Sequence, residues 1–279
     1  MGRALFGLLL GFAMVFGVVY WARTCLPTPG DDVEWLQRED AIIVQMKEAG
    51  GFDLSGAGDF MTAEVPDITL YGDGTLLVKD EENPVRLIQT NVSSGNIRSL
   101  LGFIEDQGFF GFNYEQPEPF VTDQSTTYIY ANTKLAANAV KAYALSEHTD
   151  EDDRWGQVRR LSKIAARIEG VAGAARGNAG ARDYLYDAIV LGVQKISPTA
   201  ELPQPKEWPF PDIDLTAMVG DGIFGERQFS GEQADRIVEA LAANQLFSQG
   251  SSWYVMHYRP VLPYEENFPE FEPPLSTDE

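Results

Sequence analysis

The tripeptide Gly-Asp-Gly occurs twice in the chain, at residues 72–74 and 220–222. The first copy separates two apolar, β-prone runs. Glycine adopts positive φ angles without a steric penalty, and an aspartate side chain bonds readily to the backbone that follows it, so the tripeptide favours a tight turn. The first copy therefore predicts a hairpin with strands over residues 67–71 and 75–79. The second copy predicts a turn of the same kind.

Hydrophobic periodicity and capping residues predict the remaining elements. Helices are expected over residues 31–48, 95–107, 154–169 and 232–244. Further strands are expected over residues 85–90, 126–133, 136–145, 184–196 and 251–258. Because strands come in groups before a helix instead of alternating singly with helices, the expected fold is α+β, with antiparallel sheets and packed helices.

The second half of the chain repeats the order of elements in the first. Residues 100–110 and 237–247 share their apolar positions, and each block follows a Ser-Gly pair and, further upstream, a Gly-Asp-Gly. A duplicated strand–turn–strand–helix unit explains this order. The alternative is that two amphipathic helices resemble each other without a duplication.

Shifts in composition divide the chain into six segments. Residues 170–181 are nearly all glycine and alanine; they could extend the preceding helix, but their glycines favour a flexible connector. The expected segments are a transmembrane anchor (1–22), a juxtamembrane linker and helix (23–64), a first α+β unit (65–170), a Gly/Ala connector (171–182), a second α+β unit (183–265) and a proline-rich acidic tail (266–279).

Residues 4–21 carry no charge and no proline. A helix needs about 20 apolar residues to span a bilayer, and this run is just long enough. Arg3 precedes it and acidic residues follow it, which favours a cytoplasmic amino terminus and a soluble domain on the extracytoplasmic side, periplasmic or extracellular. The run is longer than the core of a usual signal peptide, and no cleavage site of small residues follows it. The sequence therefore predicts an uncleaved single-pass anchor, with lipidation of Cys25 as the alternative.

The formal net charge of -21 excludes a nucleic-acid partner, which would need a basic surface. Solubility alone explains the charge; steering of basic partners is the second interpretation. The single cysteine excludes a disulfide within the chain and cysteine-based metal or haem sites, and only two histidines exclude a histidine-rich metal site. No cofactor is predicted.

Several acidic residues and two histidines are candidate functional groups. Asp73 and Asp221, with Asp123, could form a carboxylate site for acid–base chemistry or calcium, but turn formation explains the first two. The run from Asp150 to Asp153 lacks the ligand spacing of a calcium loop and suits a helix amino terminus. Neither His148 nor His257 accompanies a recognisable nucleophile. No catalytic, cofactor-binding or metal-binding residue is predicted, and the protein is not expected to be an enzyme.

Short motifs spread along the chain resemble an uncharacterised family of membrane-anchored or lipoprotein-like bacterial proteins, of the kind found in actinobacteria and Chloroflexi. They are the Val-Pro-Asp-Ile-Thr-Leu-Tyr-Gly-Asp-Gly run at residues 65–74, Thr122-Asp123, the Trp208-Pro209 loop ending near Asp214-Leu215, and the Arg-Pro-x-Leu-Pro-x-Glu run at residues 259–265. The resemblance implies attachment to a membrane and lends no activity. The lipoprotein signal is absent before Cys25, which favours the transmembrane anchor.

The expected function is that of a non-catalytic accessory or structural subunit of a larger membrane complex, of respiratory or photosynthetic electron transfer. Its partners would be the membrane, through the amino-terminal helix, and other subunits. An unrecognised carboxylate-based hydrolase or a ligand-binding module is the alternative. Aromatic loops are the expected docking elements, and Phe268 and Phe271 are expected to contact a partner. Trp208 and Phe229 are expected to fold back on their own sheet, and for Phe210 both alternatives remain.

Overall fold

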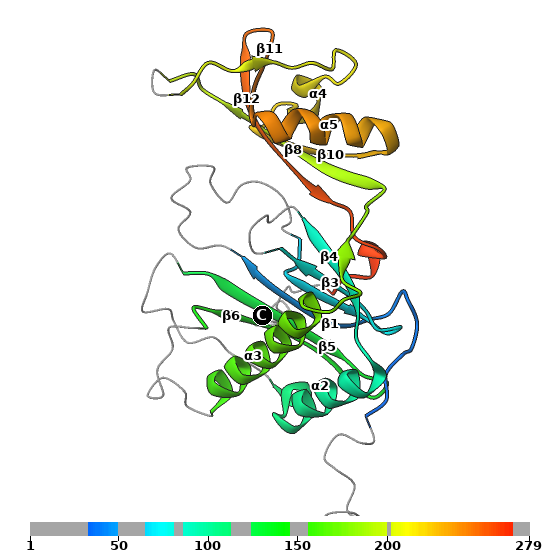
Figure 1. The fold of residues 1–279 in the computed structure, drawn as a ribbon. Coiled ribbons are helices and arrows are strands. Elements are labelled where there is room, and N and C mark those ends of the chain that lie inside the picture. The colour runs from blue at the N-terminus through cyan, green and yellow to red at the C-terminus, as the bar shows by residue number, and fades with distance from the viewer. Residues whose placement is uncertain are drawn as a thin grey trace, which may run out of the picture.

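The computed structural model describes residues 33–49, 65–80, 86–112, 124–145, 156–199 and 202–269. These residues form two lobes, each a largely antiparallel sheet with helices packed on one face (Figure 1). The predicted α+β class is confirmed. Among these residues no helix combines the length and the apolar character needed to cross a membrane; the predicted anchor at residues 4–21 lies outside them.

The first lobe contains a seven-stranded sheet in the order β6-β5-β1-β2-β3-β4-β7. Its strands are β1 (Ile42–Ala49), β2 (Ile68–Tyr71), β3 (Thr75–Lys79), β4 (Leu87–Asn91), β5 (Thr126–Asn132), β6 (Ala137–Tyr143) and β7 (Arg182–Asp183). Helices α2 (Ser94–Asp106) and α3 (Gln157–Arg176) cover one face, with the short 3-10 helix η1 (Phe109–Gly111) after α2. Apolar residues at helical spacing on both helices bury the core against this face.

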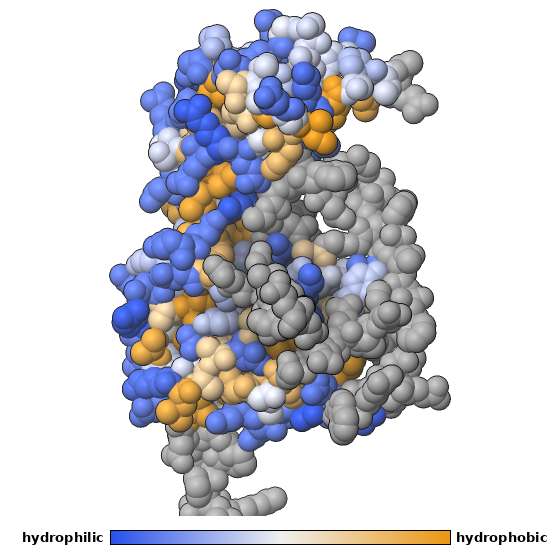
Figure 2. Space-filling view, turned by 180° about the vertical axis from the view of Figure 1, so that it is seen from behind, coloured by the Kyte–Doolittle hydropathy of each residue, from blue (hydrophilic) through white to orange (hydrophobic). Residues whose placement is uncertain are grey.

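The second lobe contains a five-stranded sheet in the order β10-β8-β12-β11-β9. Its strands are β8 (Ala188–Ile196), β9 (Lys206–Glu207), β10 (Phe224–Ser230), β11 (Leu246–Gln249) and β12 (Ser252–Pro260). Helices α4 (Leu215–Val219) and α5 (Gly231–Ala243) pack on one face, and the 3-10 helix η2 (Glu265–Asn267) follows β12. Seen from behind, the described surface of both lobes is mostly hydrophilic, as the acidic composition requires (Figure 2).

The first Gly-Asp-Gly forms the predicted β2–β3 hairpin. Asp73 closes the turn, because its Oδ1 accepts a hydrogen bond from Thr75 N (2.8 Å) and its Oδ2 one from Thr75 Oγ1 (2.9 Å). Gly74 has φ +95°, which an L side chain rarely adopts. The second copy does not form a hairpin: it joins α4 to β10, with Gly220 at φ +60°. The prediction of two equivalent turns is therefore wrong.

The predicted helix at residues 31–48 is wrong, because β1 occupies most of its second half. The helix prediction counts Val33, Leu36, Ile43 and Met46 among its apolar positions. Instead Ile42 to Met46 are all buried, since helices cover one face of this strand and a second apolar cluster covers the other. A central strand that is buried on both faces has a continuous apolar sequence without alternation, and β-branched residues favour the strand conformation.

Helix α3 continues to Arg176, so the first residues of the expected Gly/Ala connector are helical. Ala172 and Ala175 are buried against the sheet, and this packing stabilises a segment that its glycines weaken. The first lobe therefore extends from residue 33 to β7, beyond the predicted unit at both ends.

The two lobes do not repeat one topology. Each has a strand, a helix and a hairpin in that order, β4-α2-β5-β6 and β10-α5-β11-β12. In the first lobe the leading hairpin strand, β5, pairs with the central β1; in the second lobe the trailing strand, β12, pairs with β8. Most of residues 100–110 and 237–247 lie in α2 and α5, which are both amphipathic helices packed on a sheet. A duplicated unit stays a prediction.

Residues 260–268, here called the return segment, run from the second lobe back to the first. Leu262 is buried in a cluster with Tyr71 and Leu77, on the sheet face opposite α2 and α3. Tyr71 donates a hydrogen bond to Pro263 O (2.8 Å). The segment is drawn in red between the lobes in Figure 1. Its fold is fixed by Glu265, which accepts hydrogen bonds from Arg259 at 2.9 and 2.6 Å and from Leu262 N at 3.1 Å.

Candidate functional site

A cleft of about 470 Å³ lies between the carboxyl-terminal half of α3 and the ends of three strands of the first lobe. Strand β1 ends there, β2 begins there and β3 ends there. The helix contributes residues at positions i, i+3, i+4 and i+7, which share one helical face. The volume lies in the range of small-molecule sites. The cleft, called the α3 cleft below, is lined by Met46, Glu48, Asp67, Ile68, Lys79, Asp80, Glu169, Ala172, Gly173 and Arg176.

Small and apolar residues shape the inner part of the α3 cleft. Met46, Ile68 and Ala172 are buried and form its apolar lining. Gly173 leaves room on the helical side, because a Cβ built there meets no atom within 4 Å. The Cβ of a larger residue at Gly173 would therefore clash with no atom of the cleft.

The cations of the cleft are already engaged. Lys79 Nζ lies 3.3 Å from Asp67 Oδ1, and Asp67 Oδ2 also accepts a hydrogen bond from Glu48 N (2.6 Å). Arg176 Nη2 donates to Lys79 O (3.0 Å), which ties the end of α3 to the end of β3.

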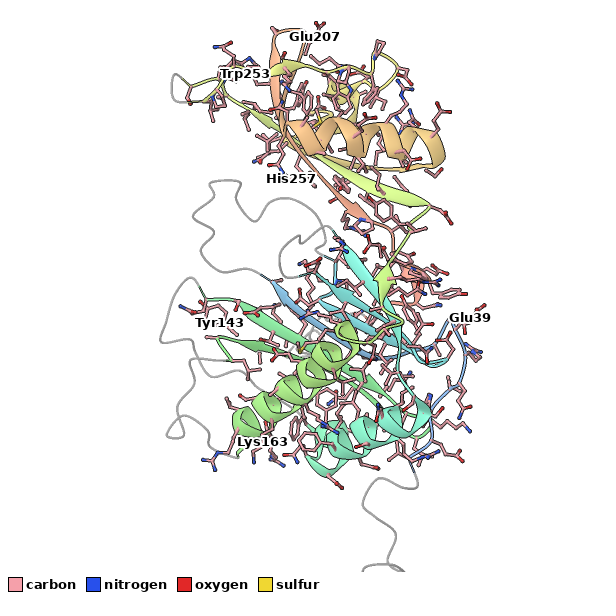
Figure 3. The ribbon with its side chains drawn as sticks, viewed as in Figure 1. Glu39, Tyr143, Lys163, Glu207, Trp253 and His257 are labelled. Carbon is pink, nitrogen blue, oxygen red and sulfur yellow. The ribbon has the colours of Figure 1, made fainter. Side chains whose placement is uncertain are left out.

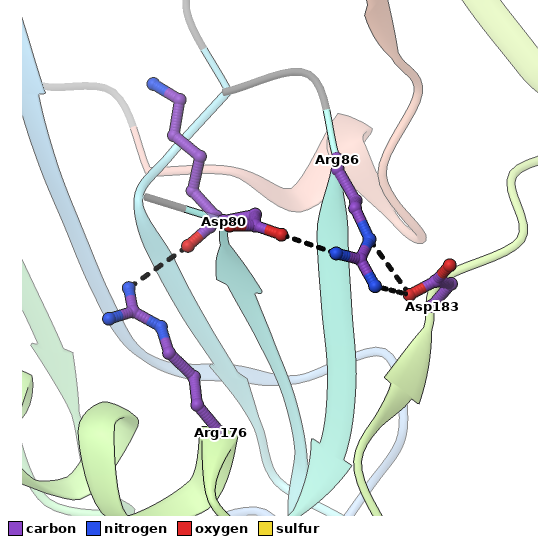
Figure 4. Close-up of polar contacts among 5 residues, drawn as sticks. Asp80, Arg86, Arg176 and Asp183 are labelled. Carbon is purple, nitrogen blue, oxygen red and sulfur yellow. Dashed lines mark hydrogen bonds and ion pairs between the residues drawn. The ribbon is translucent and has the colours of Figure 1, made fainter. Parts of the chain in front are cut away.

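The rim continues from β3 to β7 through a second arginine. Arg86 Nη1 lies 2.8 Å from Asp80 Oδ2 and its Nη2 lies 2.5 Å from Asp183 Oδ1 (Figure 4). Asp80 is therefore partly neutralised from outside the cleft. These contacts hold the strand ends and the helix end in one arrangement.

Two carboxylates of the cleft differ from the rest. Glu48 accepts a hydrogen bond from Ser125 Oγ, and no described lysine or arginine lies within ion-pair distance of Glu48 or Glu169. Glu169 is largely exposed, but partial burial raises the pKa of its carboxyl, and the negative charge of Glu48 raises it further, while Arg176 opposes both effects. The arrangement can attract a positively charged ligand with an apolar body.

The structure does not bring the predicted carboxylates together. Asp73 lies on the β2–β3 turn of the first lobe and Asp221 on the α4–β10 turn of the second, where it is exposed. Asp123, His148, the run from Asp150 to Asp153 and Cys25 lie outside the described residues. Among the described residues no group of three or more His, Cys, Asp or Glu side chains could hold a metal ion.

His257 lies on β12, on the sheet face opposite α5. Its neighbours Tyr254 and Met256 are in the core under α5, and alternation along the strand sends His257 to the other face (Figure 3). Burial lowers the pKa of His257. The neutral imidazole is therefore the favoured form of His257 near neutral pH. Figure 3 shows Trp253 on the same strand, away from the α3 cleft.

The aromatic loops are mostly part of the cores. Trp208, Phe210 and Phe229 are all buried in the second lobe, and the Trp208 ring lies 4.8 Å from that of Phe210 and 5.1 Å from that of Phe247. The expectation that Trp208 and Phe229 fold back is confirmed. Phe268, expected to meet a partner, packs against the buried cluster around Leu262. The side chain of Phe268 is only partly buried there, so a partner contact at Phe268 stays a prediction. Phe271 lies outside the described residues.

Sequence reasoning missed the residues of the α3 cleft. A signal was present in the spacing of Glu169, Ala172, Gly173 and Arg176, which marks one helical face once the glycine-rich run is taken as helix. The strand residues carried no such signal, because Glu48 had been assigned to a helix and Asp67 and Lys79 to an ordinary hairpin.

No protein-family model, curated protein or solved structure matches this chain. The resemblance to an actinobacterial or Chloroflexi family of membrane-anchored proteins therefore stays a prediction.

Proposed function

We propose that this protein is a non-catalytic, single-pass membrane protein whose two lobes lie on the extracytoplasmic side. The observation that carries the proposal is the uncharged run at residues 4–21, followed by acidic residues. The first described residue, Val33, lies twelve positions after the end of this run. In this role the protein is an accessory or structural subunit of a larger membrane complex, such as one of electron transfer.

Membrane extraction tests the anchor. After washing with alkaline carbonate, the full chain stays in the membrane pellet and its amino-terminal sequence begins within the first residues. A protein that begins at Cys25 or later, or that the wash releases, contradicts the anchor. Protease added to intact spheroplasts then degrades both lobes if they are extracytoplasmic.

Affinity purification in a mild, uncharged detergent tests the accessory role. Subunits of one membrane complex are expected to co-purify in fixed proportions and to be identified by mass spectrometry. If the chain purifies alone from cells that make the complex, the accessory role is contradicted. The proposal of a membrane anchor is not affected by that result.

The α3 cleft favours a second candidate function, that of a ligand-binding module. This candidate does not require the anchor, because every residue of the cleft belongs to the first lobe. A shared acid–base role for Asp73 and Asp221 receives no support, since the two residues lie on turns of different lobes.

A further inference from the structure

We infer that the α3 cleft binds the ammonium group and alkyl chain of an aliphatic amine. This inference rests on the ligand-binding candidate above and is independent of the membrane anchor. The source of the amine is either a free diamine or a lysine side chain on a partner, which share the same chemistry.

Charge selects a cation. Four carboxylates and two cationic side chains line the cleft, so negative charge is in excess. Lys79 neutralises Asp67, and Arg86 reaches Asp80 from outside. The excess is therefore concentrated on Glu48, from β1, and Glu169, from α3, and Arg176 offsets only part of it. A cation near both carboxylates relieves their repulsion. The raised pKa of Glu169, caused by burial and by Glu48, is consistent with this repulsion.

Geometry selects an ammonium over a planar guanidinium. An ammonium carries three donors that point in different directions, so it can follow acceptors that are not coplanar, whereas a guanidinium holds its five donors in one plane. Glu48 projects from β1 and Glu169 from α3, two separate elements. The negative charge of Glu48 acts on the Glu169 carboxyl, and divergent donors suit acceptors that come from two separate elements.

The apolar lining selects the alkyl chain. Met46, Ile68 and Ala172 offer apolar surface beside the carboxylates, and Gly173 leaves the helical wall open. An aliphatic chain buried there gains about 0.8 kcal/mol per methylene group. A small inorganic cation would leave this surface uncovered.

Titration calorimetry on the full chain, in uncharged detergent micelles, tests the inference. The probes are Nα-acetyl-lysine-N′-methylamide, 1,4-diaminobutane and, as a neutral control with the same alkyl chain, Nα-acetyl-norleucine-N′-methylamide. The lysine amide or the diamine is expected to bind saturably, and the norleucine amide at least about tenfold more weakly, because a charged hydrogen bond contributes more than an apolar contact. Tighter binding of the lysine amide identifies a partner's side chain as the source; tighter binding of the diamine identifies a free polyamine.

Two variants and a matched control locate the binding. Glu169→Gln is expected to weaken amine binding at least about tenfold, because the charged acceptor is lost. Gly173→Leu is expected to abolish it by filling the cleft. Gly170→Leu, on the same helix at another position with open space, leaves binding unchanged. Both leucine substitutions raise helix propensity, so the variants are expected to fold.

Binding of the norleucine amide as tight as that of the lysine amide overturns the inference, as does an absence of saturable binding by either amine. Wild-type affinity in Glu169→Gln or Gly173→Leu overturns it as well. None of these results bears on carbonate extraction, so a failure of this inference is distinguishable from a failure of the anchor.

Discussion

A side chain cannot be placed at Gly72 without moving the backbone, because a Cβ there would lie 1.8 Å from the carbonyl oxygen of Leu36. The segment ahead of β1 crosses the β2–β3 turn at this point, and Gly72 N donates to Ala41 O (2.8 Å). The three residues of the tripeptide have different roles. Gly72 lets the segment ahead of β1 approach the turn closely, Asp73 closes the turn, and Gly74 supplies the positive φ. The sequence predicted the last two roles, which are local, but not the first, which depends on residues far upstream.

Gly72→Ala is expected to lower the free energy of unfolding by about 3 kcal/mol, because the added methyl forces two backbone segments apart. Urea unfolding of the full chain in micelles, followed by circular dichroism, measures the loss. Gly170→Ala serves as the control: its Cβ meets no atom within 4 Å, and it is expected to be neutral or to stabilise by up to about 1 kcal/mol. Equal midpoints for the two variants would contradict the described crossing.

Glu169 gives a pH-dependent prediction. Its carboxyl has a raised pKa in the folded protein, so folding disfavours the charged carboxylate. The resulting loss of folding stability is absent at low pH and grows as the pH rises through the folded pKa. Glu169→Gln is therefore expected to raise the thermal midpoint at pH 7 and to leave it unchanged at pH 4. Melting curves of both proteins at the two pH values test this. A larger gain at pH 4 than at pH 7 would mean that the sign of the shift is wrong.

Strands and helices with one exposed face were the elements that the sequence predicted well. Helices α2 and α5 and the β5–β6 hairpin lie close to their expected bounds, because each is half buried and shows its period. Strand β1 is covered on both faces and shows no alternation, so it was taken for a helix. Helix α3 contains a glycine-rich end that propensity disfavours and packing stabilises. Both errors fall on the α3 cleft, which explains why the site could not be predicted.

The return segment depends on one partly buried ion pair. Arg259→Met removes the two guanidinium hydrogen bonds of Glu265 and leaves its partly buried carboxylate with the hydrogen bond from Leu262 N alone. Loss of the charged partner costs about 1–3 kcal/mol. Urea unfolding is expected to show a loss of that size. Arg38→Met, which removes the exposed pair with Asp40, is the control and is expected to cost less than about 1 kcal/mol. A loss no larger than the control's would show that the pair does not hold the segment.

The two lobes are held together by a segment that sequence reasoning had divided between a second unit and a free tail. Beyond the cluster around Leu262, Asn267 Nδ2 donates to Asp40 O at 3.4 Å, so the last described residues contact the first. This arrangement was not predictable because prolines at the end of a chain indicate only that it leaves helix and strand. Where such a segment packs depends on the apolar face that the first lobe leaves uncovered.

Truncation tests this arrangement. A chain that stops at Pro260 loses Leu262 and the Tyr71–Pro263 hydrogen bond, and burial of one leucine alone contributes about 1.5–3 kcal/mol. Its thermal midpoint is expected to fall by several degrees. A chain that stops at Pro269 keeps every contact described above and serves as the control. Identical midpoints for the two truncations would show that the return segment is not part of the folded core.

The hydrogen bond between Tyr71 and Pro263 can form only late in synthesis of the chain. The two residues are 192 positions apart, so the ribosome adds the second about 10–40 s after the first at ordinary rates of elongation. Throughout that interval the hairpin bearing Tyr71 is available to fold while the return segment that covers its outer face does not yet exist. The nascent chain thus exposes an apolar sheet face until residues 260–268 emerge, and during that time chaperones and non-native contacts compete for the same surface.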